Sequence, residues 1–230
     1  EELVARRALA DERPDVVVDI IDANSLERNL YLAVQLMEMG VPLVLALNMM
    51  DEVNKKGIKI NVEKLAQLLG LPVVKTIART GGGLDQLLKA AAGEAEKRRG
   101  EAWRPLLISY GPDLDAALNE MTAKIEAAEF LTRRYPARWI ALKYLESDEE
   151  IHKLGAEFNA ETHAALREIV ARVSAHLDAT LSTYPEAIIA DYRYGFINSI
   201  LKQNVLTKPE DVAARAAFSD RADQVLTHRI

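Results

Sequence analysis

The sequence predicts an α/β half built on a parallel sheet, followed by an all-α helical bundle. Short apolar runs alternate with helical patterns over about the first hundred residues. After Gly100 the strand-like runs nearly vanish, and apolar residues recur at helical spacing. A chain of 230 residues is long enough to bury a sizeable core in one large or two small domains.

The first elements are a helix, a strand and a second helix. Glu1 to Asp11 reads as a helix that Pro14 ends. Val16 to Asp22 is apolar and rich in branched residues, which predicts a buried strand. Ser25 to Met39 is amphipathic and predicts a helix. Its apolar face carries Leu26, Leu30, Val34 and Met37.

Two more strands and two more helices complete the predicted α/β half. The run from Val41 to Asn48 predicts a second buried strand. Asn61 can cap a helix that Gly70 closes. Leu71 to Ile77 predicts a third strand, and Leu84 to about Arg99 a helix. Repeated β-α-β units imply parallel strands with right-handed crossovers.

The second half reads as helices only. A new helix is expected to begin at Tyr184-Pro185, because proline suits the first helical position. Glu94 to Glu101 is charged and flanked by glycines, so it is expected to link the two parts. Residues 1–100 and 101–230 are therefore the predicted domains. The helical repeats run through Leu114, Leu118, Met121, Ile125, Leu166, Ile169, Val173, Leu177, Ile189, Tyr192, Phe196 and Ile200.

Composition excludes several classes of protein. Hydrophobic residues make up 49% and charged residues 28%, as is usual for a globular protein. No apolar run approaches the roughly 18–20 residues of a membrane span, and no secretory leader is recognisable. The absence of cysteine excludes disulfides. The net charge of −6 argues against broad binding to a nucleic-acid backbone, although specific contacts could still hold a single nucleotide.

A polar pair follows the second predicted strand. Asn48 and Asp51 come directly after an apolar run, and ligands of open α/β sheets bind beyond such strand ends. A carboxylate there can accept two N–H bonds from the edge of a guanine ring, and an amide can both donate and accept. Adenine presents different groups, so the pair selects against it. The alternative is that both residues merely form a turn.

The end of the third predicted strand supports guanine recognition over a simple turn. If the strands lie side by side, Ala78 comes close to Asn48 and Asp51. A backbone N–H at Ala78 could donate to the carbonyl oxygen of guanine, which adenine lacks. The segment could also be a plain turn that uses glycine for left-handed backbone. Together the two strand ends favour a guanine nucleotide.

Several long segments resemble one family. They are Val18–Leu32, Asn48–Asp51, Gly57–Asn61, Arg138–Leu145, Arg193–Ile197 and Ser219–Ile230. All resemble the cytosolic N-terminal region of ferrous iron transport protein B (FeoB), a bacterial membrane protein with a G-protein-like domain. The resemblance implies a partial P-loop-NTPase-like G domain over residues 1–100. A helical GDI-like domain over residues 101–230 would lead toward a membrane region.

The resemblance also implies a function. The region would bind and hydrolyse GTP and regulate Fe²⁺ uptake at the cytoplasmic face of the bacterial inner membrane. The helical domain would stabilise the GDP-bound form. The expected partners are a guanine nucleotide and the membrane-embedded remainder of the transporter, with no nucleic acid. GTP or GDP would be the ligand, with Mg²⁺ in the intact protein only.

Seven residues stand at the positions of the family's guanine-binding motifs. The first group is Asn48, Met49, Met50 and Asp51, and the second is Ile77, Ala78 and Arg79. Within this match Asn48 and Asp51 would read the base. Ile77 is a departure, because a serine commonly precedes the alanine in G proteins. The backbone contact should survive, but a hydroxyl that steadies the loop would be missing.

The phosphate-binding motifs do not occur in the sequence. No Gly-x-x-x-x-Gly-Lys-Ser/Thr and no Asp-x-x-Gly switch motif of the family is found. That loop supplies the N–H cradle for phosphates, the phosphate lysine and the Mg²⁺ hydroxyl. We therefore expect the chain to carry the guanine-recognition half, without catalytic or metal-binding residues. In the resembling fold the phosphate-loop strand pairs beside Val16 to Ile21, so this strand is expected to be an open edge where copies could associate.

Two other function classes remain open. The chain could be a non-enzymatic helical interaction module with a vestigial α/β half. It could also be an α/β enzyme acting on a small metabolite, but no nucleophile–base pair or paired carboxylates support this.

Other polar residues are expected to be structural. His163 and His176 are 13 residues apart, which on one helix places them roughly 220° apart, so we predict surface histidines, as for His152, and no metal ligands. Glu146 to Glu150 should form a solvated loop and the first turn of a helix, where negative charge suits the helix dipole.

Three aromatic residues and two strand-end residues complete the set. Asp22 and Asn24 are expected to organise a turn. Tyr192, Tyr194 and Phe196 are expected to pack in the core or at its boundary, with an interaction surface as the alternative.

Overall fold

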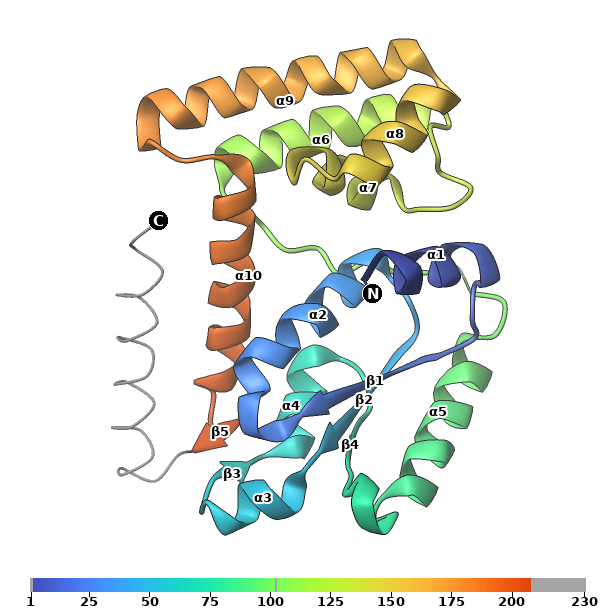
Figure 1. Cartoon of the computed structure of the whole chain (residues 1–230), viewed down its shortest axis with the longest axis vertical. Coiled ribbons are helices and arrows are strands. Elements are labelled where there is room, and N and C mark those ends of the chain that lie inside the picture. Colours follow the sequence, from blue (N-terminus) through green and yellow to red (C-terminus); the bar gives the residue numbers. More distant parts are fainter. Residues whose placement is uncertain (1, 102, 208–230) are drawn as a thin grey trace.

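The computed structural model describes residues 2–101 and 103–207 (Figure 1). The resembling segment Ser219–Ile230 lies outside these residues. Ten α-helices are described: α1 (Glu2–Glu12), α2 (Leu26–Met39), α3 (Met50–Lys55), α4 (Val62–Leu69), α5 (Leu84–Arg98), α6 (Pro112–Ala127), α7 (Ala137–Leu145), α8 (Glu149–Phe158), α9 (Ala160–Leu181) and α10 (Pro185–Leu201). Two short 3-10 helices, η1 (Ala23–Ser25) and η2 (Ala78–Thr80), follow strands.

The central sheet is parallel, as the repeated β-α-β pattern predicted. Its strands are β1 (Val17–Asp22), β2 (Leu43–Asn48) and β4 (Val73–Lys75), in the order β1-β2-β4. A second, antiparallel pair joins β3 (Lys59–Ile60) to β5 (Leu206–Thr207). The expected α/β half followed by helices is confirmed, although β5 brings the end of the described chain back to the α/β half.

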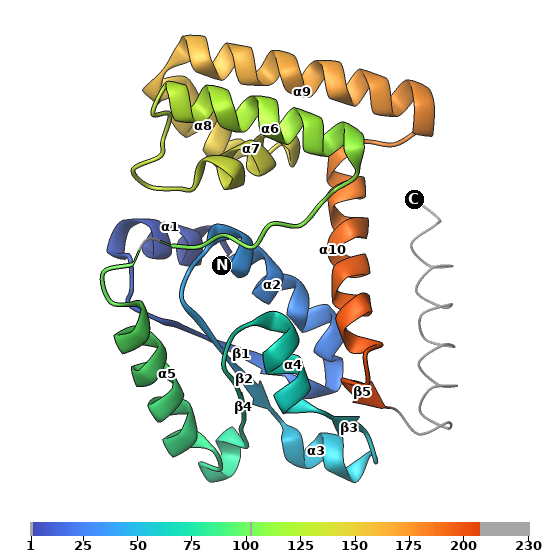
Figure 2. The same cartoon turned by 180° about the vertical axis from the view of Figure 1, so that it is seen from behind.

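The elements form two stacked parts (Figures 1 and 2). Helix α5 covers one face of the sheet, and α2 and α4 cover the other. Helices α6 to α9 form a separate layer, and α10 runs from that layer along α2 to the sheet end. The predicted cap at Asn61 is confirmed, since its side chain accepts the Lys64 N–H at 2.9 Å. Gly70 ends α4 in left-handed backbone (φ 70°), as expected.

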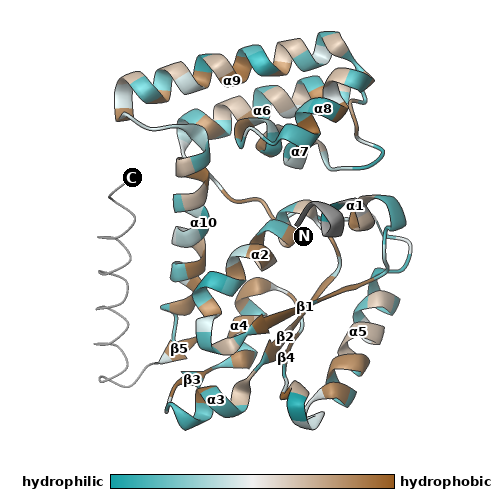
Figure 3. Ribbon diagram, in the orientation of Figure 1, coloured by the Kyte–Doolittle hydropathy of each residue, from teal (hydrophilic) through white to brown (hydrophobic). Residues whose placement is uncertain are grey.

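The strands carry the apolar core of the α/β half (Figure 3). Every residue of β2 before Asn48 is buried. The expectation that Val16 to Asp22 is fully buried was wrong, because Val18 is 36% exposed and Ile20 65% exposed. Both lie in register with buried β2 residues, but the main contacts of α5 with the sheet are to β2 and β4. Among the described strands β1 pairs with β2 alone, so the predicted open edge is confirmed.

Asp19 lies in β1 without a hydrogen-bond partner for Oδ2 among the described residues. Burial raises the pKa of this carboxyl from 3.8 to about 6. The folded state therefore binds a proton between these pH values that the unfolded chain has already lost. Its stability falls as the pH rises through this interval.

Replacing Asp19 with Asn is expected to raise the free energy of unfolding by about 1–3 kcal/mol above pH 7, because the amide carries no charge to desolvate. The gain should shrink toward pH 4. Urea unfolding at several pH values measures both. Asp15→Asn is the control, since Asp15 is exposed just before β1 and should change stability little. An equal effect of Asp19→Asn at pH 4 and pH 7.5 would contradict the assignment.

Two of the three predicted surface histidines are partly exposed and also pack against Tyr144. His152 stacks on the Tyr144 ring with centroids 4.4 Å apart. The Tyr144 hydroxyl and His163 Nδ1 are 2.8 Å apart. His176 is exposed, as expected. Helix α8 can approach Tyr144 of α7 because Gly155 of α8 has no side chain. A Cβ at Gly155 would overlap the Tyr144 hydroxyl.

The acidic segment before α8 is only partly what the sequence predicted. Helix α8 does begin there, and Asp148 caps it by accepting the Ile151 N–H at 3.0 Å. The expected solvated loop was wrong, because Asp148 also forms an ion pair with Arg6 of α1. Glu146 is half-buried in a second ion-pair cluster.

The aromatic residues of α10 lie at a boundary. Tyr192 is 43% and Tyr194 39% exposed, whereas Phe196 is partly buried against the core. Tyr194 packs on Tyr31 of α2 with centroids 5.0 Å apart. The structure thus supports boundary packing for these residues.

Candidate functional site

The carboxyl ends of β1 and β2 meet at one corner of the sheet. Asn48 ends β2 and lies in register with Asp22 of β1. Met49 turns the chain with left-handed backbone (φ 62°), and α3 begins at Met50. Asp51 therefore lies in the first turn of α3, where the helix dipole favours a negative side chain. We call Asn48–Asp51 the base corner.

The third strand end reaches the base corner as predicted. The backbone N–H of Ala78 donates to Asn48 Oδ1 at 3.0 Å, across 30 residues of sequence. The Thr76 N–H donates to the Leu47 carbonyl at 2.8 Å and carries the β2–β4 pairing to the strand end. The donor that we expected to meet guanine is thus satisfied by the Asn48 amide in this structure.

Asp51 has a cationic neighbour from the same loop. Arg79 Nη2 lies 3.3 Å from Asp51 Oδ2, with the Arg79 side chain 78% exposed and the Asp51 side chain 23% exposed. Exposed ion pairs of this kind contribute about 0–1 kcal/mol. A ligand with two N–H donors could therefore compete with Arg79 for the carboxylate.

The loop after β4 is held by its own contacts. The Ile77 N–H donates to the Gly82 carbonyl at 2.8 Å. Thr80 Oγ1 donates to the Ile77 carbonyl at 3.2 Å. The absence of a serine hydroxyl at Ile77 is thus partly offset by Thr80, which the sequence reading did not single out.

Lys56 is a second residue near the base corner whose contact was not predicted from the sequence. It donates to Asn24 Oδ1 at 2.8 Å, and Asn24 in turn donates to Asp22 Oδ1 through its backbone N–H at 2.8 Å. Asp22 and Asn24 therefore organise a turn, as expected, and they tie it to α3. No local pattern signals a contact between residues 24 and 56, because they are 32 positions apart.

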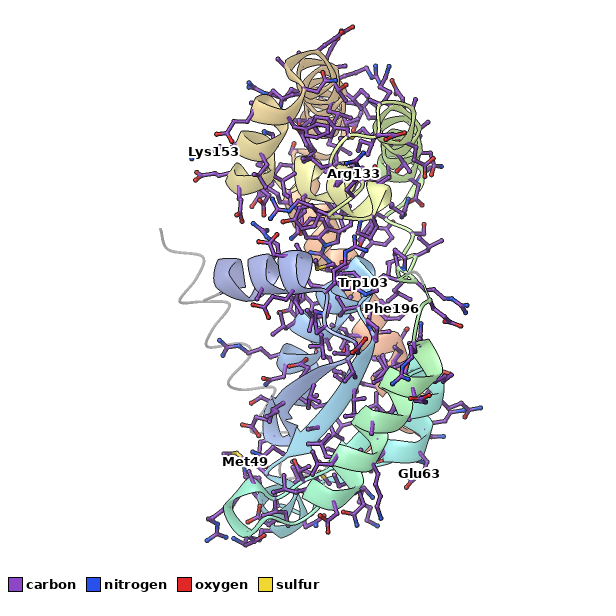
Figure 4. The ribbon with its side chains drawn as sticks, turned by 90° about the vertical axis from the view of Figure 1, so that its right-hand side faces the viewer. Met49, Glu63, Trp103, Arg133, Lys153 and Phe196 are labelled. Atoms are coloured by element: carbon purple, nitrogen blue, oxygen red, sulfur yellow. The ribbon has the colours of Figure 1, made fainter. Side chains whose placement is uncertain are left out.

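The methionines of the motif differ in exposure. Met49 is 46% exposed, and its side chain lies at the surface (Figure 4). Met50 is buried in the core and lines a cavity of about 430 Å³. Thr76, Ile77 and Gly83 also line this cavity, but Asn48 and Asp51 do not, so it shares only Met50 with the base corner.

The described part of the chain offers neither a metal site nor a membrane-spanning helix. No group of three or more histidine, aspartate or glutamate side chains is placed to hold a metal ion. No helix there combines the length and apolar character needed to cross a membrane.

Two family models match the chain. The model of ferrous iron transport protein B matches residues 1–91, and the model of the FeoB cytosolic helical domain matches residues 110–205. An Fe(2+) transport protein A/Fe(2+) transporter FeoB fusion protein of Porphyromonas gingivalis is 39% identical over 237 residues. The Fe(2+) transporter FeoB of Staphylococcus aureus is 33% identical over 230 residues. The whole chain is matched, but it spans only 27% and 32% of these two proteins.

Solved structures show the same likeness. An mGMPPNP-bound NFeoB from S. thermophilus superposes with a TM-score of 0.73 and 32% identity, over 89% of this chain and 73% of that one. A mutant NFeoB from S. thermophilus bound to GDP superposes with a TM-score of 0.74 and is 32% identical. The match covers 90% of this chain and 75% of that one.

Proposed function

This chain belongs to the ferrous iron transport protein B (FeoB) family, and from that premise we propose that it is the guanine-recognising part of a cytosolic regulatory region of a ferrous iron transporter. One observation carries the proposal: Asn48, Asp51 and the Ala78 backbone converge at the ends of β2 and β4. In that reading the transporter binds and hydrolyses GTP at the cytoplasmic face of the bacterial inner membrane, and this region regulates Fe²⁺ passage through its membrane-embedded partner.

Base recognition follows from the donors and acceptors at the corner. Asp51 would accept the two N–H bonds of the guanine edge in place of its contact with Arg79. The guanine carbonyl would accept the Ala78 N–H in place of Asn48 Oδ1. Asn48, released from that contact, would turn its amide toward the ring. Met49, Met50, Ile77 and Arg79 would line the same corner.

The residues of this chain do not fit Mg²⁺. The Ser/Thr of the phosphate loop and the switch aspartate do not occur in the sequence, and the described residues bring no three candidate ligands together. Mg²⁺ and the hydrolytic chemistry are therefore proposed for the whole transporter only. In P-loop proteins the phosphates supply charge-assisted bonds, whereas the base contacts mostly supply selectivity.

The 230-residue chain by itself is expected to bind GTP and GDP weakly or not at all, and not to hydrolyse GTP. Titration with labelled nucleotide and a phosphate-release assay test this. Weak binding should favour guanosine over adenosine, which NMR shift perturbation of the Ala78 amide can follow. Sub-micromolar affinity or sustained turnover would overturn the proposal that this chain recognises the base without binding the phosphates or hydrolysing GTP. An equal response to both nucleosides would favour the alternative, a helical interaction module with a vestigial α/β half.

The open edge supports a further part of the proposal. Val18 and Ile20 are exposed on a strand with one hydrogen-bonded neighbour among the described strands. Unpaired apolar edges pair readily with other chains. We therefore propose that copies of this chain associate through Val16 to Ile21 when no other segment covers the strand.

A further inference from the structure

A buried polar cluster joins the helical layer to the α/β half. Its members are charged or hydroxyl side chains that meet around the guanidinium group of Arg193, which is 0% exposed. We call it the junction cluster. It consists of Tyr31 and Glu38 of α2, Tyr110, Lys143 of α7, Glu146 and Arg193 of α10.

Arg193 connects two carboxylates from different parts of the fold. Its Nε donates to Glu38 Oε2 at 2.9 Å, and its Nη1 lies 2.5 Å from Glu146 Oε1. Lys143 Nζ lies 3.1 Å from the other Glu146 oxygen. The Tyr110 hydroxyl donates to Glu38. Two carboxylates thus face two cations, which balances the charge at a site where an unpaired ion would be very unfavourable.

The cluster fixes α2 against α10. These helices lie side by side in both ribbon views (Figures 1 and 2). Glu38 lies in the last turn of α2, and Arg193 lies in the middle of α10. Tyr31 adds a second contact along the same helix pair, because Arg193 Nη1 lies 3.3 Å from its hydroxyl. The cluster therefore sets how the helical layer meets the sheet.

Both helices lead from the cluster to elements next to α3, the helix that carries Asp51. The start of α2 follows η1, where Asn24 accepts a hydrogen bond from Lys56 at the end of α3. The end of α10 leads to β5, which pairs with β3, and Asn61 donates its N–H to the Val205 carbonyl at 2.8 Å. Strand β3 follows α3 in sequence. Helix α3, which carries Asp51, is therefore held from both directions.

We propose that Arg193 is a positioning residue for the base corner: by locking α2 to α10, it lets the helical layer set the position of α3 and of Asp51. The inference rests on the proposed function, because the position of α3 matters for guanine only if Asp51 reads the base. It makes no claim that Arg193 touches a nucleotide.

Amide hydrogen exchange on the 230-residue chain tests the proposal. Arg193→Met removes the guanidinium group and keeps the stem, whereas Glu38→Gln keeps the shape and removes one charge. Both are expected to accelerate exchange in residues 50–60 by about two- to thirtyfold, with β4 and α5 unchanged. The combined variant should be milder than the product of the two, because Lys143 and Glu146 stay paired and no lone carboxylate remains.

Tyr144→Phe is the matched control. It removes a buried hydroxyl contact with His163 inside the helical layer without touching the junction cluster. It should lower thermal stability yet leave exchange in residues 50–60 unchanged. A uniform rise over the whole chain in Arg193→Met and Glu38→Gln, or no change at α3, would overturn the inference. Glu38→Gln decides the matter if Arg193→Met does not fold.

A parallel guanosine titration separates the two proposals. A wild-type chain whose Ala78 amide responds equally to guanosine and adenosine overturns the proposed function, whatever the exchange data show. A wild-type chain that prefers guanosine, combined with unchanged exchange and unchanged guanosine affinity in Glu38→Gln, overturns the positioning role alone. A loss of guanosine affinity that accompanies faster exchange at α3 supports both.

Discussion

Asp51→Asn is expected to shift the base preference from guanine toward xanthine in a FeoB protein of full length that carries this sequence. An amide at this position loses one of the two acceptors that a guanine edge requires, but it can donate to the second carbonyl oxygen of xanthine. Hydrogen bonds to charged groups contribute about 1.5–3 kcal/mol each, so guanine affinity should fall roughly a hundredfold. Competition between GDP and xanthosine diphosphate for a labelled nucleotide measures the shift.

Asp22→Asn is the control for this change. Asp22 ends the neighbouring strand, and its carboxylate accepts the Asn24 N–H within the turn. Asparagine can accept the same bond, so the base preference should not move. If guanine selectivity persists in Asp51→Asn, the carboxylate of Asp51 does not read the base.

Gly83→Ala is expected to lower the free energy of unfolding by about 3–5 kcal/mol and to displace the loop that carries Ala78. Gly83 has left-handed backbone (φ 84°), and a Cβ there would overlap the Lys75 carbonyl oxygen. Backbone cannot yield as a flexible side chain can, so the turn must move. Urea unfolding measures the loss of stability. Chemical shifts of Ala78 and Asn48 report whether their 3.0 Å hydrogen bond survives.

Gly70→Ala separates the clash from the backbone strain. Gly70 also has left-handed backbone (φ 70°), but nothing lies within 4 Å of a Cβ built there. Its substitution should cost only the strain of about 1–2 kcal/mol. It should leave the Ala78–Asn48 contact intact. Equal losses in the two variants would show that crowding against Lys75 has no part in the effect.

The fold class could be predicted from the sequence because its signals are local. The apolar run of β2, the Asn61 cap and the Gly70 stop each specify backbone structure within a few residues. The convergence of Asn48 and Ala78 could also be anticipated, because the carboxyl ends of parallel strands meet at one edge. In this sheet the strands lie side by side in the same order as they follow one another in the sequence.

Other features depended on partners that no local pattern reveals. Val18 and Ile20 read as buried because they are apolar, but their exposure depends on how far α5 extends across the sheet. Glu146 read as solvated because it is acidic, but Arg193 lies 47 positions away in the chain and pairs with it in space.

The sequence by itself determined the order of helices and strands, the α/β and helical parts, and the residue types at the strand ends. Only the tertiary structure decided which charges are buried together, that Arg79 pairs with Asp51, and that the end of α10 returns to the α/β half through the pairing of β5 with β3. The physical reason is the distance along the chain over which each kind of interaction acts. Backbone preference and apolar periodicity act over one or two helical turns, whereas the ion pairs and hydrogen bonds of the junction and the base corner exist only once packing has brought distant residues together.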